Sequence, residues 1–175
     1  QILADEEGHV VCLGERDCSV QRRHQKLLEE SPSPAILPAA REALFRDVAD
    51  AVRAIGYTGV GTLEFLCDPN GNLWFMEMNV RLQVEHAVSE MLTLVDLVKW
   101  QIRTAAGVSL PFSQTDIPMK GAVIECRINA LSPGTVSLLH VPGGPFVRFD
   151  TYLVQGVAVS RHARRGPAQD ARRAL

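Results

Sequence analysis

The sequence predicts an α+β fold in which helices flank an antiparallel sheet. Two strand-like segments, residues 62–67 and 73–78, flank Asn70-Gly71, a dipeptide that strongly favours a β-hairpin turn. Pro38 precedes apolar residues at the spacing of an amphipathic helix. Strands joined by a tight hairpin, next to a single long helix, are typical of an α+β domain and not of alternating parallel βαβ units.

The first part of the chain reads as short strands. Residues 2–4 and 9–15 are strand-like and flank the turn-prone residues 5–8. Another strand-like stretch lies around residues 26–29 and ends at residues 31–34, where two prolines prevent regular pairing.

The helices are predicted from apolar spacing and end signals. Pro38 occupies a favoured first-turn position and Gly56 closes the helix; the apolar positions between them are Leu44, Val48, Ala51, Val52 and Ile55. A second helical region is expected over residues 84–106, with a break near Thr93. Residues 122–129 read as a strand, and the pattern weakens after Ala130.

Composition fits an ordinary globular protein. Of the 175 residues 46% are hydrophobic and 22% charged, and the net charge of −2 offers no general attraction to nucleic acid or acidic membranes. No apolar run approaches the ~20 residues of a membrane span. The four cysteines lack zinc-ligand spacing, so we assign them no chemistry and expect a reducing compartment: the cytoplasm, or the mitochondrial matrix in a eukaryote.

Two carboxylates are predicted to face each other across the hairpin. A turn centred on Asn70-Gly71 pairs residue 67 with 74 and Glu64 with Glu77, on one face of the sheet. Facing like charges are destabilising unless a cation compensates, and Mg²⁺ or Mn²⁺ prefers such oxygen ligands. Asn79, two residues further on, would add a carbonyl ligand. A solvated face with no metal remains the alternative.

Three motifs carry a resemblance to a known family. They are residues 15–26, Glu64 with residues 77–86, and residues 125–130. In this order they resemble the signatures of biotin carboxylases, members of the ATP-grasp superfamily that occur as subunits or domains of acyl-CoA and pyruvate carboxylases. The match runs from Gln1 to about Ala130.

The resemblance implies a domain organisation. Residues 1–115 would be the C-terminal part of an ATP-grasp domain, and residues 116–160 a partial biotin carboxylase C-terminal domain. Residues 161–175 would form a divergent basic tail. The stretch 131–141 is shorter than the family pattern. We therefore expect a fragment of a longer enzyme, inactive in isolation.

The resemblance also implies the chemistry. Bicarbonate would attack the γ-phosphate of ATP to give carboxyphosphate, which supplies CO₂ to biotin, the acceptor. Glu64, Glu77 and Asn79 would hold Mg²⁺ or Mn²⁺. Lys26 and Arg81 would bind bicarbonate or phosphoryl oxygens.

The remaining implied roles complete the site. Gln83 and the backbone of Val84 would complete the bicarbonate pocket, Glu85 would be the general base, and Arg127 would steady carboxyphosphate and the biotin enolate. The nucleotide would be bound by Gln21, His24, Gln25, Leu66, Glu64 and Glu77.

Two other functions remain open. One is a different ATP-grasp carbon-nitrogen ligase, which Lys26 and Arg127 in their motifs argue against; the other is a non-catalytic assembly or binding module. The implied partners are a biotin carboxyl carrier protein or domain, a carboxyltransferase subunit, and a second copy in a homodimer of the full-length parent. We expect neither nucleic acid nor membrane as a partner.

Overall fold

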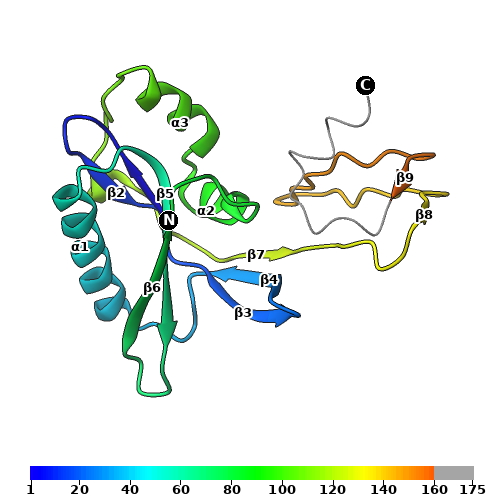
Figure 1. The fold of residues 1–175 in the computed structure, drawn as a ribbon, viewed down its shortest axis with the longest axis horizontal. Helices are drawn as coiled ribbons and strands as arrows, with labels where there is room; N and C mark the ends of the chain where they lie inside the picture. Colours follow the sequence, from blue (N-terminus) through cyan, green and yellow to red (C-terminus); the bar gives the residue numbers. More distant parts are fainter. Residues whose placement is uncertain (160–175) are drawn as a thin grey trace. The chain divides into compact units, whose positions relative to one another are not determined.

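A computed structural model describes residues 1–159 and shows two compact units (Figure 1). The first unit runs from Gln1 to Arg127, and the second begins at Ile128. The predicted second domain, starting at residue 116, thus begins within the first compact unit. The boundary at residue 116, which the resemblance implies for the family's domains, stays a prediction. The predicted basic tail, residues 161–175, lies outside the described residues.

The first unit is built on a four-stranded antiparallel sheet in the order β2-β1-β5-β6. Its strands are β1 (Ile2–Ala4), β2 (Val10–Cys12), β5 (Gly59–Cys67) and β6 (Leu73–Asn79). The short turn between β1 and β2 and the hairpin between β5 and β6 are those expected from the sequence. The predicted α+β class is therefore confirmed.

Alternate residues of this sheet supply two separate cores. Ile2, Ala4, Val10 and Cys12 pack on one face against Val48, Ala49 and Val52 of helix α1 (Pro38–Ala54). On the other face, the core contains Leu3, Val11, Leu13, Val60, Leu97 and Trp100. The last two belong to helix α3 (Leu97–Ala105), so α1 and α3 cover opposite faces, as Figure 1 shows.

A second antiparallel sheet has the order β3-β4-β7. It contains β3 (Asp17–Arg22), β4 (Gln25–Ser31) and β7 (Val123–Cys126). β3 was not predicted from the sequence, because its residues are mostly polar and exposed. Its hairpin turn is Arg23-His24, with positive φ at both residues, instead of a dipeptide such as Asn-Gly. The strand predicted over residues 122–129 is shorter, because only 123–126 pair with β4.

The β5–β6 hairpin has the predicted Glu64–Glu77 pair but a different register near the turn. Cys67 lies opposite Leu73, and not opposite residue 74 as predicted, because the loop contains one residue more than a four-residue loop over 69–72. A bulge between the Glu64 and Phe65 pairs restores the predicted register at the carboxylates. The prediction for residue 67 was therefore wrong, and that for the two glutamates is confirmed.

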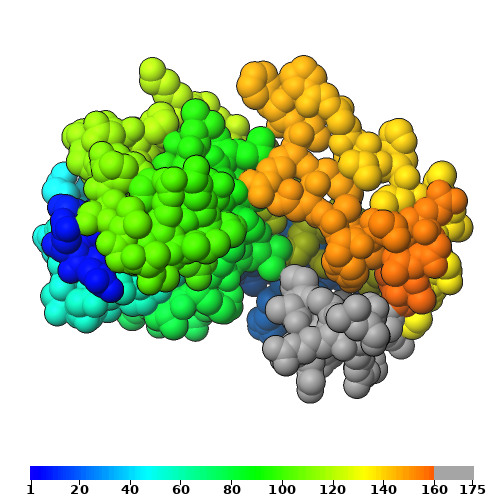
Figure 2. Space-filling model, turned by 90° about the horizontal axis from the view of Figure 1, so that it is seen from above, coloured from blue at the N-terminus to red at the C-terminus, as the bar shows by residue number. Residues whose placement is uncertain are grey.

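The expected break in the second helical region is present. Helix α2 (His86–Thr93) ends at Leu94 in the left-handed conformation, and α3 follows with Asp96 capping its first turn. The short 3₁₀ helix η1 (Gln114–Asp116) comes next. In the space-filling view, the green surface of α2 and α3 covers much of the first unit (Figure 2). Within residues 1–159, no helix is long and apolar enough to cross a bilayer.

The second unit pairs two short strands, β8 (Gly134–Thr135) and β9 (Ala158–Val159). No residue from 128 to 159 is buried. This part of the chain therefore has no apolar core of its own, and every contact that carries the site described below lies in the first unit.

Candidate active site

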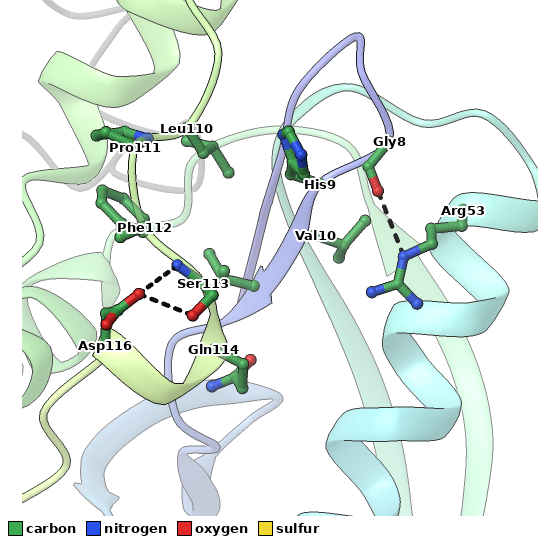
Figure 3. A pocket seen from close by; sticks show the side chains of 11 residues that line it. Gly8, His9, Val10, Arg53, Leu110, Pro111, Phe112, Ser113, Gln114 and Asp116 are labelled. Atoms are coloured by element: carbon green, nitrogen blue, oxygen red, sulfur yellow. Dashed lines mark hydrogen bonds between the residues drawn. The ribbon is translucent and has the colours of Figure 1, made fainter.

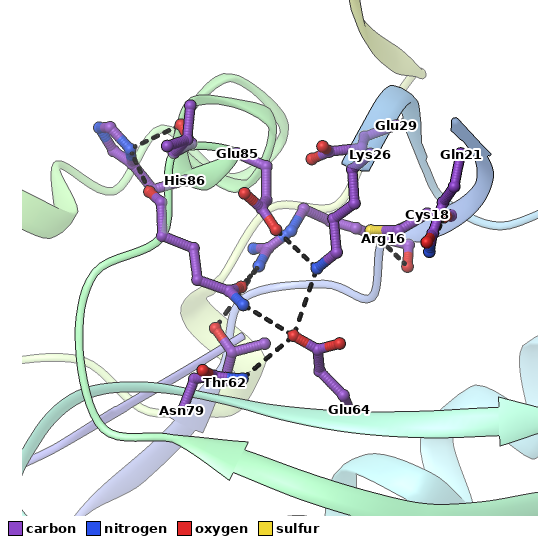
Figure 4. A network of polar contacts seen from close by, with 12 residues as sticks. Arg16, Cys18, Gln21, Lys26, Glu29, Thr62, Glu64, Asn79, Glu85 and His86 are labelled. Carbon is purple, nitrogen blue, oxygen red and sulfur yellow. Dashed lines mark hydrogen bonds and ion pairs between the residues drawn. The ribbon is translucent and has the colours of Figure 1, made fainter. Parts of the chain in front are cut away.

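One network of polar contacts between the two sheets of the first unit joins several of the predicted site residues: Lys26, Glu64, Asn79, Gln83 and Glu85 (Figure 4). β4 supplies Lys26, β5 supplies Glu64, and Arg127 directly follows β7. Glu85 immediately precedes α2. Four segments that are far apart in sequence therefore place charged side chains within hydrogen-bonding distance.

Lys26 links the two carboxylates at the centre of this network. Its ammonium donates to Glu85 at 2.7 Å and to Glu64 at 3.2 Å. Burial by itself would lower the pKa of Lys26, but the hydrogen bond to Glu85 and the charges of both glutamates outweigh burial, and the net pKa is raised. Lys26 is therefore a fixed cation at neutral pH.

Glu85 is buried, with 4% of its surface exposed. Arg127 donates to its second carboxylate oxygen at 3.0 Å, so each oxygen has a cationic partner. Burial raises the pKa of this carboxyl, but Lys26, through its hydrogen bond and charge, and the charge of Arg16 hold it below its usual range. Glu85 is therefore ionised and able to accept a proton.

Glu29 is a second buried carboxylate, which was not predicted as a site residue from the sequence. The same nitrogen of Arg127 donates to it at 3.2 Å. Burial, followed by the negative charges of Glu85 and Glu125, raises its pKa to about 7, although Arg127 and Lys26 act in the opposite direction. Glu29 thus shares a cation with Glu85 and is about half protonated at neutral pH.

The metal-ligand candidates lie together, joined by an amide group. The Nδ2 of Asn79 donates to Glu64 at 3.1 Å and to Glu77 at 3.0 Å. Three N–H donors, from Lys26, Asn79 and Gln83, converge on the same Glu64 oxygen. These three N–H groups donate to the Glu64 carboxylate where a metal cation would bind. The side chains of Glu64, Glu77 and Asn79 therefore fit a divalent metal ion.

Asn79 is turned away from the predicted orientation. Its carbonyl oxygen accepts from Arg81 at 3.2 Å, while its NH₂ group faces the carboxylates. Ligation of a metal by Asn79 would therefore require its amide to rotate, which would release Arg81. Arg81 is otherwise exposed and donates to the carbonyl of Leu82 at 3.3 Å.

Gln83 is buried between Glu64 and Arg16. Its Nε2 donates to Glu64 at 2.8 Å, and its Oε1 accepts from Arg16 at 2.7 Å. The neighbouring Val84 is half exposed, and its carbonyl faces the ring of His86 at 3.1 Å. Gln83 thus joins the network directly, whereas the Val84 side chain does not.

A cavity of about 570 Å³ opens beside this network. Among the predicted nucleotide-binding residues, Gln21, Glu64 and Leu66 line it, together with Lys26. His24 and Gln25 do not line it; they are exposed at and beside the β3–β4 turn, and Glu77 is exposed on β6. The structure therefore brings half of the predicted nucleotide residues to one cavity.

Cys18 lies close to the site without reactive character. Its sulfur and one oxygen each of Glu29 and Glu85 lie within 4.8 Å of one another. Burial raises the pKa of this thiol to about 11, against the opposing charge of Lys26. The thiol is therefore neutral, which agrees with our assigning no chemistry to the cysteines.

A second cavity, of about 500 Å³, lies beside the edge strand β2 (Figure 3). Gln114 covers that edge, because its side-chain amide exchanges hydrogen bonds of 2.7 and 2.9 Å with the backbone of Cys12. Arg53 reaches the carbonyl of Gly8 from α1. None of the predicted site residues lines this cavity.

Arg16 and Glu29 are the site residues that sequence reasoning missed. Arg16 lies in the motif over residues 15–26 that carried the resemblance, so its position was visible although its role was not. Glu29 lies in a strand whose pairing with β7 could not be read from the sequence. Only the contacts that the fold gives these two residues bring them into the site.

Comparison with known proteins identifies the family and several similar proteins. Residues 1–113 match the family described as "Carbamoyl-phosphate synthase L chain, ATP binding domain", and the chain belongs to this family. The biotin carboxylase of Allochromatium vinosum is 52% identical over 169 residues, 93% of this chain and 37% of the relative. The chloroplastic biotin carboxylase 1 of Populus trichocarpa is 52% identical over 87% of this chain and 30% of its own length.

A solved structure supports the same relationship. The biotin carboxylase domain of 2-oxoglutarate carboxylase from Hydrogenobacter thermophilus, a dimer in complex with MgADP and bicarbonate, matches with a TM-score of 0.89 at 48% identity. The match covers 92% of this chain and 37% of that one. The predicted ATP-grasp fold and the resemblance to biotin carboxylases are confirmed. The chain spans a little over a third of the length of these two bacterial relatives.

Replacing Glu29 with glutamine should change the pH dependence of stability. An acid whose pKa rises from 4.5 unfolded to about 7 folded binds more protons in the native state between these values. Its contribution to the free energy of unfolding therefore falls as pH rises, by up to about 3 kcal/mol. Glu29→Gln should remove this loss, so urea denaturation should show the variant gaining stability relative to the native chain from pH 4.5 to 7.5.

Glu30→Gln makes the same substitution on the opposite face of β4 and controls for the loss of a carboxylate. A constant stability difference between Glu29→Gln and the native chain across this pH range would contradict the assignment of a raised pKa to Glu29.

Proposed function

We propose that this chain forms part of a biotin carboxylase, which uses ATP and bicarbonate to carboxylate biotin on a carrier protein through carboxyphosphate. The observation that carries the proposal is the buried, ionised Glu85 held between Lys26 and Arg127, next to the Glu64 carboxylate. Such an arrangement combines a base, two anion-binding cations and a metal-binding group in one place.

In this proposal Glu85 is the general base that deprotonates bicarbonate. Lys26 now donates to Glu85, which keeps its carboxylate ionised but weakly basic. If Lys26 turns to an incoming anion, the carboxylate loses that donor and the effect of burial raises its proton affinity. The binding of bicarbonate by Lys26 would thereby activate Glu85 at the moment when the proton is to be removed.

Glu64 and Glu77 would hold Mg²⁺ or Mn²⁺, which would neutralise charge that develops on the transferred phosphoryl group. Asn79 would contribute its carbonyl oxygen after its amide turns. Arg81, released by that rotation, would then be free to bind an oxyanion with its planar fork.

The cavity beside Glu64 is the proposed nucleotide site. It combines the exposed apolar side chain of Leu66 with the polar Gln21 and the cation Lys26. An apolar surface for a base and a cation for phosphates are the two elements that a nucleotide requires. His24 in the β3–β4 turn, Gln25 beside it and the exposed Glu77 on β6 would contact the nucleotide. Arg127 would steady carboxyphosphate and the biotin enolate.

The partners and the compartment are part of the same proposal. We propose a biotin carboxyl carrier protein or domain, a carboxyltransferase subunit, and a homodimer of the full-length protein; the dimeric Hydrogenobacter structure supports the last. The free cysteines support a reducing compartment, such as the cytoplasm or the mitochondrial matrix. The relative from Populus trichocarpa is chloroplastic.

Mn²⁺ binding tests the metal site in this chain itself. Glu64→Gln keeps the shape of the side chain but removes its charge, so the affinity for Mn²⁺ should fall by about tenfold or more. Electron paramagnetic resonance can measure free Mn²⁺ in a titration. Asp47→Asn, which removes an exposed carboxylate from α1, is the control and should bind like the native chain. Equal affinity of all three chains would contradict the proposed site.

Bicarbonate-dependent hydrolysis of ATP tests the reaction in the full-length protein that carries this segment. With Mg²⁺ and free biotin, turnover should require bicarbonate, and Glu85→Gln should lower it by about 10² to 10⁴-fold, because the base is lost. Glu42→Gln on the exposed face of α1 should retain activity. Turnover that requires ammonia or an amino acid in place of biotin would instead indicate another ATP-grasp ligase.

A further inference from the structure

Arg16 occupies the segment between β2 and β3 and donates to four side chains. One terminal nitrogen donates to Gln1 at 2.8 Å and to Ser89 at 2.9 Å. The other donates to Gln83 at 2.7 Å and to Thr62 at 3.5 Å. These partners come from β5, α2, the start of the chain and the loop after β6, so the guanidinium is fixed in position by the fold.

The chemistry of arginine determines how the Gln83 amide is oriented. A guanidinium has donors and no acceptor, so the Gln83 atom that faces it must be the carbonyl oxygen. The NH₂ group then faces the opposite side, where it donates to Glu64 at 2.8 Å. If the amide were reversed, its NH₂ group would lie 2.7 Å from the guanidinium nitrogen of Arg16, and its oxygen would lie 2.8 Å from the carboxylate oxygen of Glu64. Both contacts would be repulsive.

From these contacts we propose that Arg16 is a positioning residue, which orients Gln83 so that its NH₂ group faces the anion-binding part of the site. The inference rests on the proposed function, in which Gln83 contacts bicarbonate. Glu64 imposes the same orientation only while its oxygen is free to accept from Gln83. Once Glu64 ligates a metal ion, Arg16 is the constraint that remains.

The orientation matters because bicarbonate carries a negative charge. An amide that presents its NH₂ group donates a hydrogen bond to the anion, whereas one that presents its oxygen repels it. Gln83 is 6% exposed, so a misoriented amide has little solvent with which to pair. Arg16 should therefore affect chiefly the binding of bicarbonate; its charge acts on the pKa of Glu85 less than Lys26 does, so the proton transfer should change less.

Steady-state kinetics of the full-length protein that carries this segment provide the test. Arg16→Met should raise KM for bicarbonate by about tenfold or more, with KM for ATP and kcat at saturating bicarbonate changed less than about threefold. Arg16→Lys keeps a charged donor and should recover part of the loss. Arg41→Met is the matched control, because Arg41 is also largely buried and pairs with Glu15, next to Arg16, but does not contact Gln83.

A double-mutant cycle separates positioning from a general structural role. If Arg16 acts through Gln83, adding Arg16→Met to Gln83→Ala should raise KM for bicarbonate no further. Independent, additive effects of the two substitutions, or an equal loss in kcat for Arg16→Met and Arg41→Met, would overturn the proposal.

A second measurement on the 175-residue chain requires no activity. The ¹³Cδ resonance of Gln83 should move upfield in Arg16→Met, because its carbonyl loses the hydrogen bond, and should stay in place in Arg41→Met. An unchanged resonance in Arg16→Met would contradict the orientation. If the resonance moves while the native full-length protein shows no bicarbonate-dependent turnover, the orientation stands and the proposed function fails.

Discussion

The organisation of the site depends on one buried carboxylate held between two cations. Glu85 accepts from Lys26 on β4 and from Arg127 directly after β7, so the start of α2 is tied to two neighbouring strands of the three-stranded sheet. Removing one partner of a buried ion pair leaves the other charge uncompensated and typically costs about 3–5 kcal/mol. The two sheets, and with them Glu64 and Gln83, are thus held in place by the same charges that serve the proposed reaction.

The hydrogen bond from Lys26, which Glu85 receives and Glu29 does not, contributes most to the difference in pKa between these two buried glutamates. Glu85 has a cation on each oxygen, and its pKa is held below the usual range despite burial. Glu29 has only a share of Arg127, and burial together with the charge of Glu85 raises its pKa to about 7. Neighbouring acids with pKa values moved apart are typical of sites that handle protons.

Local patterns in the sequence predicted most of the larger sheet, its helices and the Glu64–Glu77 pair, because hairpins and amphipathic helices depend on nearby residues. The bulge that sets the register at Glu64 could not be predicted, since no local signal marks the extra residue. The resemblance identified Lys26, Glu85 and Arg127 as candidates. The contacts of Arg16 and Glu29, in contrast, depend on long-range pairing that only the folded chain supplies.

The most direct test of this account is the titration of the two buried carboxyls in the 175-residue chain. Carboxyl ¹³C resonances, assigned with Glu85→Gln and Glu29→Gln, would be followed across pH 2 to 9. The account predicts that Glu85 titrates below the usual range of a glutamate, and that Glu29 titrates near pH 7. If Glu85 instead titrated above Glu29, the paired cations would not control the site and the central claim would be contradicted.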